Sequence, residues 1–138
     1  MTKGQALTAV VLVHLAISLV HGRAHAGGQV PLSAAASVFV YVVILAGPLV
    51  GLVVARRQPR AGALIVGISM AAALLFGLVN HFIINGSDHV SQVAAEWRTL
   101  FAVTAALLVV SEGAGTAVAI WAGRSSNSEL KVGVQTRS

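Results

Sequence analysis

The stretch AGALIVGISMAAALLFGLVNHFII, residues 61–84, decides the class of this protein. It contains no Asp, Glu, Lys or Arg, and a helix needs about 20 such apolar residues to cross the hydrocarbon core of a bilayer. The run is continuous and shows no alternation of apolar and polar positions, so it predicts a helix rather than a strand of a barrel. We therefore expect residues 61–84 to form a transmembrane helix.

Three further apolar runs, at residues 5–22, 32–55 and 99–123, have the same character. The chain is 57% hydrophobic and 9% charged, whereas about a quarter of the residues of a soluble domain are charged. Because short connections favour antiparallel neighbours, the sequence predicts an all-α integral membrane protein, an up-down-up-down bundle of four transmembrane helices. We expect residues 1–123 to form this single domain and residues 124–138 to be a disordered polar tail.

Lysine and arginine predict how the bundle lies in the membrane. Lys3, the loop RRQPR at residues 56–60 and the basic residues of the tail lie at one end, whereas the other end has only Arg23 and Arg98. Loops rich in Lys and Arg stay in the cytoplasm. We therefore expect both termini inside and the other two loops outside, in a bacterial-type cytoplasmic membrane.

The first apolar run also fits a secretory signal peptide. It has a basic start, an apolar centre and Ala24-His25-Ala26 as a cleavage site. A histidine inside the apolar stretch argues against this interpretation, and cleavage would leave three spans that fit the charge distribution poorly. We therefore expect the first run to be a retained helix.

The composition excludes several classes of function. The net charge of +5 is not arranged as a basic stripe with interleaved aromatic residues, so we expect no nucleic-acid binding. The absence of cysteine excludes disulfides and thiolate metal sites. No phosphate loop, nucleophile–base pair or dinucleotide fingerprint is present. The expected partners are the lipid bilayer and either further copies of the chain or other membrane subunits.

Three histidines form a stripe on the first predicted helix. His14, His21 and His25 are 7 and 4 residues apart, and at about 100° per residue they lie within about 40° of one another. Ionisable residues inside a membrane are costly when they face lipid, so this stripe should face the interior of the bundle.

The outer end of the third predicted helix carries a second polar group at the same depth as His21. His81 and its neighbour Asn80 lie about as far from the cytoplasmic end as His21 does, and the outer loops add further ligands. Imidazoles and carboxylates without sulfur suit Zn²⁺, Fe²⁺ or Cu²⁺. The sequence therefore predicts a transition-metal site, with Asn80 in support, whose candidate ligands are His21, His25, His81, Asp88 and His89.

Other interpretations of these histidines stay open. A single interfacial histidine such as His89 or His25 is usually only solvated, and the histidines could form a hydrogen-bonded network that links helices. His21 and His81 could also ligate haem b from facing helices, in a haem- or quinone-reactive membrane subunit. A non-catalytic subunit of a larger complex is a further alternative.

Glu112 is the only acidic residue within a predicted span, and it lies about as deep as His14. A buried charge needs a partner, so we expect the two side chains to meet near the middle of the membrane. The pair is either a proton relay or part of a second metal site, or else Glu112 only links helices through Ser or Thr. Tyr41 on the second predicted helix could supply a further hydrogen-bond donor.

Small residues predict where the helices pack closely. Gly47 and Gly51, and likewise Gly113 and Gly115, should let backbones approach each other. Pro48 should kink the second helix, and its missing hydrogen bond should be replaced by a neighbouring group.

Overall fold

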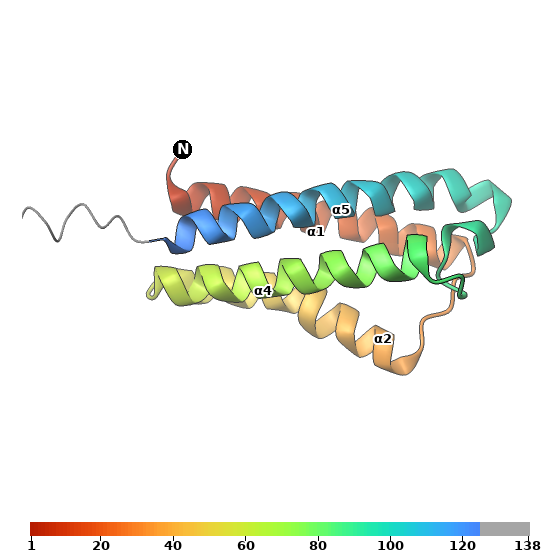
Figure 1. Cartoon of the computed structure of the whole chain (residues 1–138), viewed down its shortest axis with the longest axis horizontal. Coiled ribbons are helices and arrows are strands. Elements are labelled where there is room, and N and C mark those ends of the chain that lie inside the picture. Colours follow the sequence, from red (N-terminus) through yellow and green to blue (C-terminus); the bar gives the residue numbers. More distant parts are fainter. Residues whose placement is uncertain (125–138) are drawn as a thin grey trace, which may run out of the picture.

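The structure is a computed structural model that describes residues 1–124, and this part of the chain contains helices and no strands (Figure 1). Four helical stretches are long and apolar enough to cross a membrane, which confirms the predicted all-helical class and the four apolar helices. The predicted tail lies outside the described residues from residue 125 onwards. The elements are α1 (Lys3–Gly27), α2 (Ala34–Phe39), η1 (Val40–Ala46), α3 (Gly47–Ala55), α4 (Pro59–Leu78), η2 (Val79–Ile83), η3 (Val90–Gln92) and α5 (Ala95–Gly123).

Local sequence signals explain where the helices begin. Thr2 caps α1 by accepting a hydrogen bond from the Gln5 backbone, and the Gln5 side chain accepts one from the Thr2 backbone in return. Ser33 caps α2 in the same way through the Ala36 backbone. Pro59 begins α4, where its missing N–H costs nothing. The helix α1 continues past Gly22, so His25 stands on it one turn after His21.

Figure 1 shows α1, α4 and α5 alongside one another, with α2 leaning away from them. The Lys3 ammonium donates to the Arg124 carbonyl at 2.7 Å, so the two ends of the described chain lie together. The loops that follow α1 and η2 meet at the opposite end, where Asp88 lies against His25. One apolar core cluster, around Val11, Val66 and Met70, packs α1 and α4 together with Ala119 of α5.

Glycines bring α3 and α4 into backbone contact. A Cβ atom at Gly47 would overlap with the Ser69 side chain, and one at Gly62 would overlap with the backbone of Ala55. The close approach predicted at Gly47 and Gly51 is therefore present. Gly113 differs from the expectation, because a Cβ atom there would meet nothing within 4 Å.

The leaning segment contains a stretch of π-helix, η1, which ends two residues before Pro48. Proline has no N–H, so it cannot give the carbonyl of Ile44 the hydrogen bond that an α-helix would make. His14 Nε2 lies 3.1 Å from this carbonyl and donates to it. The group that replaces the missing helical bond is therefore a buried histidine of α1.

Candidate metal site

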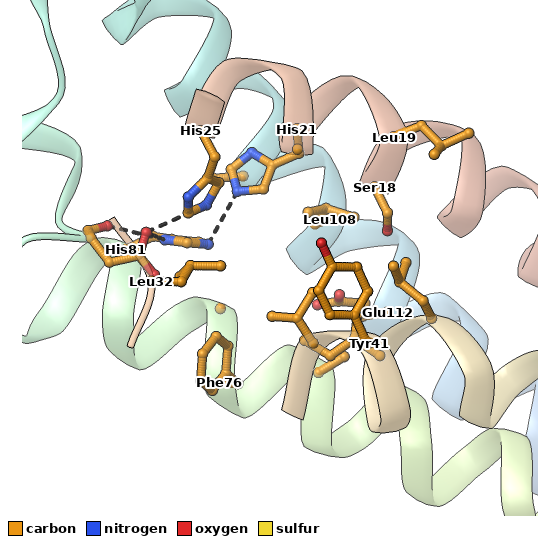
Figure 2. A pocket seen from close by; sticks show the side chains of 18 of the residues that line it. Ser18, Leu19, His21, His25, Leu32, Tyr41, Phe76, His81, Leu108 and Glu112 are labelled. Carbon is orange, nitrogen blue, oxygen red and sulfur yellow. Dashed lines mark hydrogen bonds and ion pairs between the residues drawn. The ribbon is translucent and has the colours of Figure 1, made fainter. Parts of the chain in front are cut away.

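Three histidines from two helical spans meet at the end of the bundle that carries the long loops (Figure 2). His21 and His25 lie on α1, and His81 lies on η2. One ring nitrogen from each can be chosen so that all three lie within 4.8 Å of one another. The expected meeting of His21 with His81 is present, because their Nε2 atoms are 3.2 Å apart.

The surroundings of His81 determine which of its nitrogens carries a proton. Its Nδ1 lies 3.1 Å from the backbone carbonyl of Asp88 and 3.3 Å from the carboxylate of the same residue. Both oxygens only accept, so Nδ1 carries the hydrogen. The Nε2 atom of a neutral His81 is then a free lone pair that faces His21.

Thr104 of α5 orients His21 in the same way. Its hydroxyl donates to the backbone carbonyl of Leu100 at 2.7 Å. The hydroxyl oxygen then accepts from Nδ1 of His21, which lies 2.8 Å away. In this tautomer Nε2 of His21 is a second lone pair, whereas in the other tautomer the hydroxyl donates to Nδ1 and Nε2 carries the hydrogen.

The two Nε2 atoms lie 3.2 Å apart. With both rings protonated on Nδ1, two lone pairs face each other and a cation between them makes the arrangement favourable, whereas with His21 protonated on Nε2 the contact is a hydrogen bond to His81. Two nitrogens bound to one tetrahedral ion at about 2.0–2.1 Å are roughly 3.3 Å apart. The separation of His21 and His81 fits one ion, whereas the set that includes His25 spans up to 4.8 Å, so His25 would have to move closer to bind the same ion.

His25 completes the group from one turn further along α1. Its Nε2 lies 3.4 Å from the Asp88 carboxylate, and its buried Nδ1 has no hydrogen-bond partner. Asp88 thus contacts two of the histidines from the outside of the cluster. A carboxylate behind a metal-ligating histidine holds the ring in place and raises its basicity.

Phe101 and Thr104 of α5 are two parts of the site for which the sequence predicted no role there. The Phe101 ring is fully buried and packs against all three imidazoles, at centroid distances of 4.7, 4.9 and 5.0 Å from His21, His25 and His81. The two residues share a buried face of α5 with Ala105, Leu108 and Glu112. The sequence shows this helical spacing, but the spacing does not indicate that this face of α5 contacts the histidines.

Two candidate residues lie apart from the three-histidine group. His89 is only half-buried, and its Nδ1 lies 2.7 Å from the Ser91 hydroxyl at the start of η3. Asn80 is the neighbour of His81, but its side chain donates to the carbonyl of Phe76 within its own helix. Both residues shape the local backbone.

A second polar pair lies deeper in the bundle. His14 Nδ1 and Glu112 Oε1 are 3.6 Å apart, and both side chains are almost completely buried. The predicted meeting of these residues is therefore present in the structure. The second carboxylate oxygen of Glu112 has no hydrogen-bond partner.

A cavity of about 420 Å³ connects the two polar groups (Figure 2). Its wall includes the three histidines and Asp88 at one end and Glu112 at the other. Tyr41 of η1 also lines it, although its side chain is largely exposed on the other side. The histidine cluster is thus accessible to a small molecule from inside the bundle.

Comparison of the chain with family models, with curated proteins and with solved structures found no match. Any assignment of function therefore depends on the geometry of the site itself.

Proposed function

We propose that this chain is a membrane protein that binds one transition-metal ion through His21, His25 and His81. The observation that carries the proposal is the convergence of three buried or half-buried imidazoles, in which the Nε2 atoms of His21 and His81 lie 3.2 Å apart and a polar contact on the far side of each of these two rings holds it in place. Three imidazoles without sulfur suit a first-row divalent ion, and a tetrahedral site of three histidines is typical of Zn²⁺.

In this proposal the four apolar helices cross the bilayer up and down, with both termini in the cytoplasm. The basic residues near the chain ends and in the loop at residues 56–60 support this orientation. The metal site then lies near the outer surface. The three histidines line the cavity, so an ion held by them would be open to water or a substrate from that side, as in zinc enzymes with three protein ligands.

A haem is less well supported by the same geometry. Axial ligands bind from opposite sides of the ring, so their nitrogens lie about 4 Å apart on a straight line through the iron. The nitrogens of His21 and His81 are closer than that, and Phe101 fills the space beside them. We therefore expect purified protein without a Soret absorption band.

Titration of the metal-free protein tests the proposal. The chain is purified in detergent, stripped with EDTA and dialysed against ZnCl₂, and the bound metal is measured by elemental analysis. We expect one Zn²⁺ per chain in the wild type. The variant His89→Ala should bind the same amount, because His89 lies outside the three-histidine group. A wild type that retains no metal after dialysis would contradict the proposal.

Asp88→Asn should weaken the metal site without removing it. The carboxylate contacts His25 and His81 from outside the cluster, and loss of such a partner lowers metal affinity by about 10–100-fold. Competition with a chelating dye gives the affinity. Glu96→Gln is the matched control, because it removes the same charge from an exposed position near the loop. Equal losses in the two variants would show that only the surface charge matters.

A further inference from the structure

The cavity between the metal site and Glu112 has the size of a ligand-binding site. Its volume of about 420 Å³ lies within the range of roughly 300–1,000 Å³ that small-molecule sites occupy. It extends well beyond the three histidines, so coordination of one ion leaves most of it unexplained. Its opening, its one buried acceptor and its aromatic wall indicate a second ligand.

The opening of the cavity lies on the outer face of the helices. Leu19 of α1 and Tyr41 of η1 both line the cavity, yet they are 73% and 68% exposed. In a bundle that crosses the bilayer, residues at this depth face lipid. A ligand that enters between these two residues therefore comes from the hydrocarbon phase and must itself be lipid-soluble.

The inner end of the cavity offers one unused hydrogen-bond acceptor. Glu112 is only 2% exposed and lines the cavity, and its Oε2 atom is enclosed by protein and has no partner. Its Oε1 atom faces Nδ1 of His14, whose Nε2 hydrogen is already donated to Ile44. The two facing atoms are 3.6 Å apart, which is too far for a hydrogen bond, so the Glu112 carboxyl group still lacks a donor. A buried carboxyl group at the wall of a cavity suits an uncharged donor such as a hydroxyl group.

One wall of the cavity is aromatic and held in place. Phe76 lines the cavity and stacks on Phe39 with a centroid distance of 4.9 Å and an interplanar angle of 26°. Tyr41 lies at the same cavity. Flat rings pack favourably on such side chains, so the wall favours a cyclic ligand over an acyl chain.

We propose that the cavity binds a lipid-soluble phenol or quinol whose hydroxyl group donates to the Glu112 carboxyl group and whose ring lies against Phe76. The proposal rests on the membrane insertion proposed above but does not require a metal ion. An acyl chain from the bilayer would fill the same space without a hydrogen bond to Glu112. Dependence of binding on a hydroxyl donor therefore distinguishes a phenol or quinol from an acyl chain.

The test uses duroquinol and its dimethyl ether, which have the same ring, but only the first has hydroxyl donors. Binding to EDTA-treated wild-type protein in detergent is measured by calorimetry under reducing conditions. We expect the quinol to bind about tenfold more tightly than the ether, which is the effect of one net hydrogen bond. Equal affinities, or no binding of either compound, would overturn the proposal.

A substitution of Glu112 tests whether this residue accepts the hydrogen bond from the quinol. Glu112→Met removes the acceptor at similar size, so its affinity for the quinol should fall to that for the ether. Val110→Met on the exposed side of the same helix should leave both affinities unchanged. Full quinol affinity in Glu112→Met would overturn the assignment. Because the metal is removed beforehand, failure of this test is distinguishable from failure of the metal site.

Discussion

Replacement of His21 and His81 together by alanine should abolish metal binding. The two Nε2 atoms form the closest pair of donors in the cluster, and only His25 and Asp88 would be left on that side of the cavity. Two weak donors do not hold a divalent ion against dialysis. We expect the double variant to contain less than a tenth of the wild-type zinc in elemental analysis. The single variants should have zinc contents between those of the wild type and the double variant.

The thermal stability of the same proteins gives an independent measurement. A ligand at about 100 times its dissociation constant stabilises the folded state by roughly 2.7 kcal/mol. Zinc should therefore raise the Tm of the wild type and leave that of the double variant unchanged. Circular dichroism of the metal-free proteins controls for misfolding. If zinc content and the zinc-dependent Tm shift were the same in both proteins, the three histidines would only link helices.

Gly62→Ala should destabilise the bundle strongly. The new Cβ atom would overlap with the backbone of Ala55, which cannot rotate away as a side chain can. The helices α3 and α4 would have to separate, and overpacking of this kind usually costs about 1–3 kcal/mol. We expect a lower midpoint in thermal unfolding followed by circular dichroism. The loss of unfolding free energy should lie near the upper end of that range.

Gly113→Ala is the matched control for this substitution. It adds the same methyl group to α5, where a Cβ atom meets nothing within 4 Å. Its unfolding midpoint should equal or exceed that of the wild type, since alanine favours a helix over glycine. Equal destabilisation by both substitutions would mean that the backbone contact between α3 and α4 does not limit stability.

The helical class and the stripe of histidines are predictable from the sequence because both are local properties. The length of an apolar run sets whether a helix can span a membrane, and the period of the helix places His14, His21 and His25 on one face. The predicted ends are also close to the observed ones, although α1 and α5 extend further than their apolar runs. Capping by Thr2 explains the early start of α1.

The partners of these histidines were harder to predict because they belong to other helices. A shift of one residue turns a side chain by about 100° around a helix, and sequence spacing on one helix says nothing of the rotation of the next. Asn80, next to His81, bonds to its own helix, whereas His81 points into the cluster. The π-helical turn at η2, which contains His81, has no clear signal in the sequence.

The sequence by itself determined four apolar helices and one polar face on the first of them, since hydropathy and helical period act along a single segment. The equal depth of His21 and His81 predicted their meeting, but tertiary structure alone decided that Asp88 rather than His89 reaches the cluster. Tertiary structure likewise decided that Phe101 and Thr104 support the cluster from α5. It also decided that His14 satisfies the carbonyl that Pro48 leaves without a donor. These contacts join residues far apart in the chain, so they depend on how the helices are rotated and packed against each other.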